Sequence, residues 1–405
     1  MKNRIVKLVI GALLLSGNLL PWNATADKSG AMPTTAITAF SSNQAERLLV
    51  QSLLEINDGK LQQALDTIDQ LLQAVPNFRL AHLVRGDLLM AFAQKSPKMD
   101  ATSDPTLGDF RDEARVRIER HLASNTIAKI PEPLWQLAPD QRYAIVVDTT
   151  KSRLYVYQNR DNQLHYLVDY YITMGKNGSE KFTEGDKRTP LGLYTAGQKM
   201  SRKLPDFYGE AAYPLNYPNP LDRQQGKKGH GIWLHGTPKN VYSRPPKASD
   251  GCIVMTNPDL LALAPVLQNG NTPVIIANDL TWITPNKAST ANMQALKQAI
   301  ESWRQDWESQ DTERYLSHYD TNFFSENINL QRWSSEKRRI QSASSKVSIS
   351  LSNLSMFRYP SSPATMVQVN FNQNYKSDVL ESRMQKKQYW VWDKQRWKIM
   401  YEGPA

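Results

Sequence analysis

The sequence predicts a multidomain protein with an N-terminal α-helical region, a central mainly-β domain and a C-terminal α+β domain. Its 405 residues are too many for one ordinary domain, which typically has about 100–200 residues. Apolar side chains first recur at helical spacing, then fall in short strands, and finally follow a helix-then-strand order. Hydrophobic residues make up 40% of the chain, so large cores can form. Collagen-like, low-complexity and multi-span membrane proteins are excluded.

Residues 1–26 have the three parts of a secretory signal peptide. Three basic residues in the first seven positions precede a mostly apolar run, Leu8 to Leu20, and Ala24-Thr25-Ala26 forms a small-x-small cleavage site. The apolar run is shorter than the roughly 20 residues that span a bilayer, so an uncleaved membrane anchor is the less favoured alternative. We therefore expect a periplasmic protein with no transmembrane span after signal removal.

The charge balance is basic, with 49 Lys and Arg against 39 Asp and Glu, a formal charge of +10. The signal carries three of the basic residues and no acidic one, which leaves +7 on the mature chain. A positive exported protein suits a polyanionic envelope partner such as the cell wall, whereas nucleic acid does not fit this compartment. The chain has one cysteine, which excludes an internal disulfide framework and any multi-cysteine metal site.

Residues 27–140 are expected to form the helical region. Leucines at helical spacing precede a turn at Asn57-Asp58-Gly59, a second helix ends at Pro76, and a third begins near Phe78. The run from Gly59 to Pro76 resembles the second half of a tetratricopeptide repeat (TPR). Three or more such repeats are normally needed for a stable solenoid, so a plain helical hairpin remains an alternative. Either arrangement provides a surface for an envelope protein partner.

Residues 141–280 are expected to form the mainly-β domain. Pro131, Pro133 and Pro139 mark the boundary before it. Short runs of β-branched and aromatic residues, separated by Gly- and Pro-rich segments, predict strands. The predicted strands are Tyr143–Asp148, Arg153–Tyr157, Leu167–Thr173, Gly192–Tyr194, His230–Gly236 and Pro273–Ala277.

A polar linker, 281–290, leads to the C-terminal domain, 291–405. Two helices, Ala291–Gln310 and Thr312–Tyr319, are expected first. Four strands follow: Val347–Leu351, Met366–Phe371, Gln388–Trp392 and Trp397–Tyr401. This order resembles the nuclear-transport-factor-2-like (NTF2-like) cone, in which a curved sheet wraps helices around a pocket.

The lone cysteine, Cys252, is the main candidate for chemistry. In an oxidising compartment it is either buried and inert, bound to another chain, or a reactive thiolate. Gly251 permits a tight backbone that brings amide groups close to a developing oxyanion, and His235 lies 17 positions upstream on a separate strand, where it can act as the base. These neighbours favour a reactive thiolate.

A metal site at His230 and His235 is not expected, because residues five apart on an extended strand point to opposite faces. Asp250 and Asp259 add no recognisable ligand spacing. Trp233 shares a face with His235, whereas Ile232 and Leu234 turn to the core. No cofactor is predicted.

The segments His235-Gly236-Thr237 and Ser249-Asp250-Gly251-Cys252-Ile253 resemble the catalytic motif of the L,D-transpeptidase (YkuD) domain. Upstream segments, including Met174-Gly175-Lys176 and the run 187–194, agree with it, so the resemblance covers nearly all of 141–280. With an NTF2-like domain behind it, the chain resembles the Csd6-like branch, whose members trim peptidoglycan stem peptides.

The resemblance implies that Cys252 is the nucleophile and His235 the proton donor and acceptor. The Gly236 carbonyl would orient the imidazole, and the amides of Gly251 and Cys252 would form the oxyanion hole. Further residues expected to contact substrate are Trp233, Ser249, Asp250 and Arg244.

Two positions depart from the family motif: Asp250 replaces its His and Val254 its usual Arg. A carboxylate at 250 disfavours the thiolate unless a cation offsets it. Residues considered for that cation are Lys227, Lys228, Arg244 and Lys247. The loss of the Arg removes a guanidinium that could bind a substrate carboxylate.

The predicted function is an L,D-transpeptidase that acts on peptidoglycan stem peptides through a thioacyl enzyme. Release of terminal D-Ala is followed by transfer to an amine or to water. Three alternatives stay open: an L,D-carboxypeptidase that trims tetrapeptides to tripeptides, a related amidase, and a catalytically dead cell-wall binding scaffold.

Overall fold

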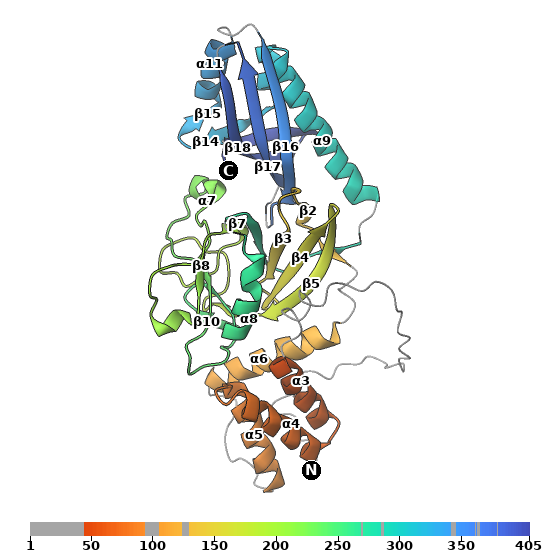
Figure 1. The fold of residues 1–405 in the computed structure, drawn as a ribbon, viewed down its shortest axis with the longest axis vertical. Helices are drawn as coiled ribbons and strands as arrows, with labels where there is room; N and C mark the ends of the chain where they lie inside the picture. Colours follow the sequence, from red (N-terminus) through yellow and green to blue (C-terminus); the bar gives the residue numbers. More distant parts are fainter. Residues whose placement is uncertain are drawn as a thin grey trace.

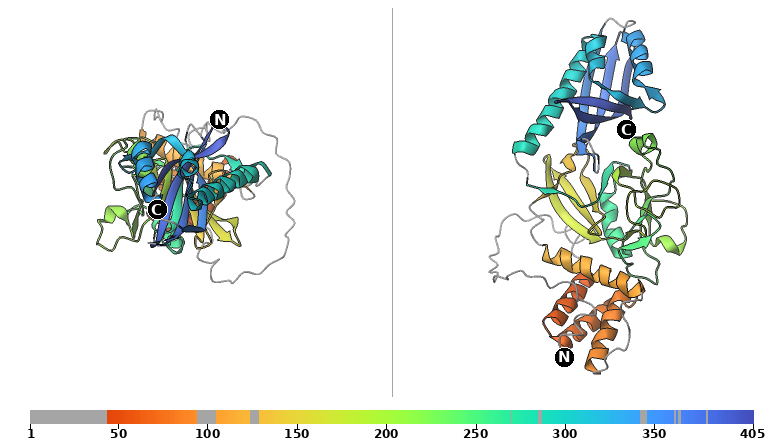
Figure 2. Two further views of the ribbon diagram at one scale, coloured as in Figure 1. Left: turned by 90° about the horizontal axis from the view of Figure 1, so that it is seen from above. Right: turned by 180° about the vertical axis from the view of Figure 1, so that it is seen from behind.

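The computed structural model describes residues 44–93, 105–123, 129–268, 270–284, 287–341, 346–360, 362, 365–378 and 380–405. The signal peptide expected at 1–26 lies outside these ranges. Three parts follow one another along the long axis of the molecule: helices at one end, a mixed central domain, and a sheet covered by helices at the other end (Figures 1 and 2). This order confirms the predicted multidomain layout. No helix within the described ranges has the length and apolar character needed to cross a membrane.

The N-terminal part consists of four helices around one core. They are α3 (Gln44–Asn57), α4 (Leu61–Ala74), α5 (Arg79–Phe92) and α6 (Pro105–Leu122). Leu49 and Leu53 of α3 pack against Ile68 and Leu71 of α4, and all four side chains are fully buried. The expected turn around Gly59 joins these helices, and its φ of 74° favours glycine. Tyr242 of the central domain completes this core.

The central domain is built on a five-stranded sheet in the order β5-β4-β3-β12-β7. Its strands are β3 (Tyr143–Asp148), β4 (Arg153–Arg160), β5 (Gln163–Tyr171), β7 (Gly192–Ala196) and β12 (Thr272–Ala277). All neighbours are antiparallel except β3 and β12. Each predicted strand of this sheet is therefore present, with bounds shifted by a few residues.

Both faces of this sheet are buried. Ile145 and Val147 point toward one core, which also contains residues of a three-stranded sheet and of helix α8 (Asn257–Leu263). Ala144 and Val146 point toward a second core, which is shared with the C-terminal domain. The three-stranded sheet has the order β11-β9-β8, with β8 (Ala212–Pro214), β9 (Trp233–His235) and β11 (Ile253–Val254). Smaller elements are β6 (Met174–Gly175), β10 (Lys247–Ser249), α7 (Pro220–Gln224) and the 3₁₀ turns Asp206–Tyr208 and Ala264–Val266.

The C-terminal domain contains a seven-stranded sheet in the order β15-β14-β19-β18-β17-β16-β2. Its strands are β14 (Tyr319–Ser325), β15 (Ile328–Asn329), β16 (Val347–Arg358), β17 (Met366–Ser377), β18 (Glu381–Asp393), β19 (Arg396–Pro404) and the edge strand β2 (Leu134–Gln136). Helices α9 (Lys287–Glu308), α10 (Thr312–Ser317) and α11 (Leu330–Gln341) accompany it. Trp303, Trp390 and Phe371 belong to the core between helices and sheet.

The segment that connects helix α6 to the central sheet contains two short strands, and each pairs with a strand far along the sequence. β2 pairs with β16 of the C-terminal sheet, and β1 (Ile130–Pro131) pairs with β13 (Trp282–Ile283) in the segment expected to be a linker. The central and C-terminal domains are thus joined by backbone pairing as well as by a shared apolar core.

Candidate active site

Two adjacent parallel strands bring the predicted catalytic residues together. β9 pairs with β11 so that Leu234 lies beside Ile253 and His235 beside Val254. Leu234 and Ile253 are fully buried in the central core. Because successive side chains of a strand point to opposite faces, His235 and Cys252 share the face directed away from that core.

His235 is buried, and its imidazole is held by its own strand. Its Nδ1 lies 2.7 Å from the carbonyl oxygen of Gly236. A carbonyl can only accept, so Nδ1 carries the proton and Nε2 keeps its lone pair. Burial, and less strongly the charge of Arg244, lower the pKa of His235 to about 4, although the Gly236 bond opposes this shift. The imidazole is therefore a neutral base at neutral pH.

Cys252 is half-buried, and its Sγ lies 3.4 Å from the carbonyl oxygen of Gly231. Burial raises the pKa of this thiol to about 11, and the charge of Asp250 acts in the same direction. A hydrogen bond from the Trp233 amide and the charge of Lys181 lower it by less. The resting site thus contains a thiol, whereas the sequence favoured a thiolate. The reason is that desolvation, which depends on the fold, outweighs the stabilising contacts.

The loop before Cys252 is closed by one buried serine. The hydroxyl of Ser249 donates to the Cys252 carbonyl oxygen at 2.6 Å and accepts the Gly251 amide at 3.1 Å. Gly251 has a φ of 121°, and a Cβ there would lie 2.7 Å from the Arg188 carbonyl oxygen, so no other residue fits. The Gly251 amide, expected in the oxyanion hole, already has an acceptor in this state. Ser249, expected at the substrate, is used by the loop.

Of the cations considered in the sequence, Arg244 is within electrostatic range of Asp250, and the structure adds Lys176 and Lys181 to the cations near the site. Asp250 is exposed and pairs with Lys176 at 3.2 Å, whereas Lys227 pairs with Asp222 at 3.0 Å. β6 and β10 pair in parallel and bring the segment of Lys176 next to that of Asp250. Neither Lys176 nor Lys181 was singled out by the sequence, because that pairing joins segments some 70 residues apart.

Arg244 lies beside the imidazole on an aromatic wall. Its guanidinium carbon is 4.6 Å from the ring centre of Phe207, and the Phe207 ring centre is 6.0 Å from that of His235. Tyr208 connects His235 to Trp233, with ring centres 5.1 and 4.8 Å away respectively. The sequence missed Phe207 and Tyr208, which lie outside the motif on a 3₁₀ turn. The guanidinium of Arg244 and these aromatic rings therefore lie side by side next to His235, the predicted base.

The connection from β9 to β10 is anchored by the helical domain. Tyr242 packs on Phe78 with ring centres 4.8 Å apart. The Ser243 hydroxyl donates to Glu113 at 2.6 Å, and Glu113 accepts from Arg117 at 2.9 Å in a fully buried ion pair. The two residues before Arg244 are thus fixed by the N-terminal helices.

Among the described residues, no group of three or more His, Cys, Asp or Glu side chains is placed to hold a metal ion. His230 is exposed and lies 3.7 Å from Glu184, whereas His235 is buried. The arrangement at Cys252 offers a thiol, a neutral base and a nearby cation, which suffice for acyl transfer.

The comparisons with known proteins agree with this geometry. Residues 142–276 match the L,D-transpeptidase catalytic domain family, and residues 295–403 match the Cds6 C-terminal NTF2-like domain family. The chain therefore contains a domain of the L,D-transpeptidase catalytic type, followed by a Cds6-type NTF2-like domain.

Two solved structures are similar to about two thirds of the chain. Bd1075 of Bdellovibrio bacteriovorus is 29% identical with a TM-score of 0.59, and the match covers 68% of this chain and 98% of that one. The helical cell shape determining protein Pgp2 of Campylobacter jejuni is 27% identical with a TM-score of 0.59, covering 68% and 96%. No curated protein matches the chain.

Proposed function

We propose that this protein is a periplasmic cysteine acyl-transfer enzyme that cleaves the terminal D-Ala from peptidoglycan stem peptides through Cys252. The observation that carries the proposal is the tautomer of His235: its Nδ1 is bound to the Gly236 carbonyl, which leaves Nε2 as a base on the strand beside Cys252.

In the acylation step, Nε2 of His235 takes the thiol proton while Sγ of Cys252 attacks the carbonyl carbon of the diaminopimelate–D-Ala amide. The C–N bond then breaks, the imidazolium returns the proton to the leaving amine, and D-Ala departs. A thioester on Cys252 remains. The backbone amide of Cys252 is a donor for the oxyanion, and that of Gly251 joins it if its bond to Ser249 opens.

Arg244 is proposed to bind a substrate carboxylate. It lies on Phe207 beside His235, and its pKa is lowered by burial, so its charge is only partly solvated. In this position it can replace the Arg that is absent at Val254. Trp233 is proposed to contact the stem peptide from the same face.

The group that attacks the thioester distinguishes the transpeptidase from the carboxypeptidase. Attack of an amine on the thioester makes a cross-link or a protein attachment, whereas attack of water makes a trimmed tripeptide. Pgp2 is a helical cell shape determining protein. We propose a role in cell shape for this protein as well, since trimming or cross-linking changes the wall that sets the shape.

The test is incubation of the mature protein with a disaccharide tetrapeptide, followed by mass spectrometry. Tripeptide with free D-Ala identifies the carboxypeptidase, and 3–3 linked dimers identify the transpeptidase. Cys252→Ala should abolish both products, with Ser201→Ala, a solvent-exposed serine, as the unchanged control. Activity that survives in Cys252→Ala would contradict the site.

The raised pKa of Cys252 favours one competing function, a catalytically dead cell-wall scaffold. Incubation with a carbapenem separates the two, because an acylating β-lactam forms an adduct only with a working nucleophile. A mass increase on wild type that is absent in Cys252→Ala supports the enzyme. A folded protein without an adduct supports the scaffold.

A further inference from the structure

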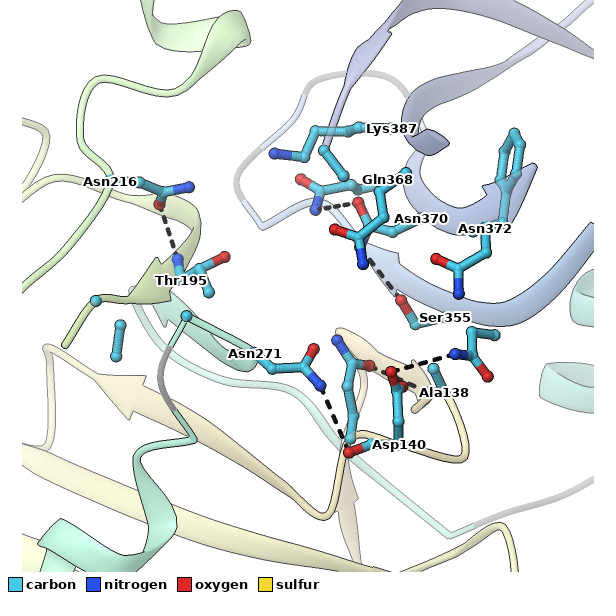
Figure 3. Close-up of a pocket in the computed structure, with 18 of the residues that line it drawn as sticks. Ala138, Asp140, Thr195, Asn216, Asn271, Ser355, Gln368, Asn370, Asn372 and Lys387 are labelled. Atoms are coloured by element: carbon cyan, nitrogen blue, oxygen red, sulfur yellow. Dashed lines mark hydrogen bonds between the residues drawn. The ribbon is translucent and has the colours of Figure 1, made fainter. Parts of the chain in front are cut away.

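A cavity of about 390 Å³, lined by both polar and apolar groups, lies between the central and C-terminal domains (Figure 3). One wall is the C-terminal sheet, with side chains from β16, β17 and β18. The opposite wall is formed by β7, the segment after β8 and the loop before β12, and Asp140 lies at one side. The cavity is separate from Cys252, which does not line it.

In the sheet wall, the side chains of β17 alternate between the core and the cavity, and those that face the cavity are polar. Along β17, Val367, Val369 and Phe371 point into the core beneath the helices. The alternate residues Gln368, Asn370 and Asn372 line the cavity on the other face. The cavity is thus on the side of the sheet away from the interior of the cone.

Two groups in this wall lack partners within the described chain. Lys387 is only 8% exposed, and its ammonium has no hydrogen-bond or ion-pair partner among the described residues. It stands in register with Asn370, and Figure 3 shows it extending into the space between the domains. Gln368 is 7% exposed, donates to Asn370 at 3.1 Å and leaves its buried carbonyl oxygen without a donor. An unpaired buried oxygen such as that of Gln368 is costly, and a bound polar ligand could satisfy it and also pair with the Lys387 ammonium.

The remaining lining groups are mostly side-chain amides that each offer a donor and an acceptor. Asn216 accepts the Thr195 amide at 2.8 Å, and Asn353 donates to Asp140 at 3.2 Å. The Asn372 side chain makes no hydrogen bond to the described residues. The charged side chains in the lining are those of Lys387 and Asp140. A sugar hydroxyl both donates and accepts hydrogen bonds, and an acetamido group does so through its N–H and C=O. The side-chain amides of the lining therefore complement an N-acetylated sugar.

From these contacts we infer that the cavity between the two domains binds one or two N-acetylated sugar units of a glycan strand, with Lys387 and Asn372 as contacts. The volume suits a group of that size, since ligand cavities are typically about 300–1,000 Å³. The inference goes beyond the proposed function, because it assigns a second site that does not require Cys252 to react. Pro214 in the cavity wall pairs with Trp233 of β9, so one small sheet connects the cavity to the strand of His235.

The experiment is calorimetric titration of the full-length mature protein with the β-1,4-linked tetramer of N-acetylglucosamine. Maltotetraose, which lacks acetamido groups, and a sugar-free stem tetrapeptide serve as comparison ligands. We expect saturable binding of the tetramer alone, equally to wild type and to Cys252→Ala. Lys387→Met and Asn372→Leu should each weaken it tenfold or more, because a buried partner is lost.

Matched controls are Lys376→Met and Asn374→Leu, exposed residues of β17 outside the cavity, which should stay within twofold of wild type. Circular dichroism checks that each variant is folded, and Asn372→Leu keeps the test valid if Lys387→Met does not fold. Three results would overturn the inference: no saturable binding to folded protein, binding of the tetrapeptide instead, or unchanged affinity in both cavity variants. Loss of activity in Cys252→Ala with sugar binding retained separates this site from the proposed reaction.

Discussion

The neutral state of the Cys252–His235 pair predicts an unusually wide pH plateau for acylation. His235 must be unprotonated to act as the base, and burial lowers its pKa to about 4. Cys252 ionises by itself only near its pKa of about 11. The acylation rate should therefore fall below about pH 4–5, as the imidazole gains its proton, and stay almost constant up to about pH 10.

The magnitude follows from the two pKa values. At pH 7, a thiol with a pKa of about 11 is ionised in about one molecule in ten thousand. Moving its proton to an imidazole with a pKa of about 4 crosses about seven pH units, or roughly 10 kcal/mol before the two charges attract each other. Two unit charges about 4 Å apart attract by roughly 4 kcal/mol near a protein surface. The attraction does not reverse the difference, so the neutral pair dominates.

The assay is single-turnover release of D-Ala, measured at half-unit steps from pH 4 to pH 10. The ultraviolet absorbance of the thiolate, taken as wild type minus Cys252→Ala, reports ionisation directly and should be absent at pH 7. An acid limb near the ordinary imidazole pKa of 6.5, or a thiolate signal at neutral pH, would refute the neutral-pair reasoning. His235→Gln should lose most of the rate and serves as the control for the acid limb.

Other changes test the loop, the substrate contact and the domain contact. Gly251→Ala should destabilise the fold by about 1–3 kcal/mol in thermal unfolding, more than Gly226→Ala, whose φ is also positive but whose Cβ would meet no atom within 4 Å. Arg244→Met should cut the acylation efficiency tenfold or more through KM with unchanged unfolding, and an unchanged KM would contradict its contact with substrate. Arg117→Met should cost about 3–5 kcal/mol in denaturant unfolding because it leaves Glu113 unpaired, and adding Glu113→Gln should restore part of the loss.

Much of the architecture could be predicted because local patterns agreed with the final packing. The central strand Tyr143–Asp148 and helix α4 each follow a clear period, and both have the expected bounds within a residue or two. Helix α11 was missed because its twelve residues are mainly polar and only Trp333 contributes a large buried apolar side chain. β2 was missed because three residues carry no pattern, and its partner β16 lies more than 200 residues away.

In the candidate site too, the sequence predicts features that depend on neighbouring residues better than features that depend on residues far apart in the chain. His235 ends β9 and Cys252 directly precedes the neighbouring strand β11, and Nδ1 of His235 lies 2.7 Å from the Gly236 carbonyl oxygen. The protonation of His235 and Cys252 does not follow from the motif, because it depends on desolvation by groups far apart in the sequence. The cations near Asp250 and Cys252 were missed for a related reason, since Lys176 reaches Asp250 only through strand pairing.

The helical domain has a structural reason to affect the chemistry, because it holds the segment directly before Arg244. Tyr242 is 8% exposed and belongs to the helical core, so burial of this side chain stabilises the contact by roughly 2 kcal/mol. Ser243 is tied to the buried pair of Glu113 and Arg117. Arg244 follows directly, and its carbonyl accepts the Tyr171 hydroxyl at 2.8 Å. Because the backbone at Arg244 is held by these contacts, the loop loses less freedom when the guanidinium binds a carboxylate, so the helices act on the substrate through the preorganisation of this loop.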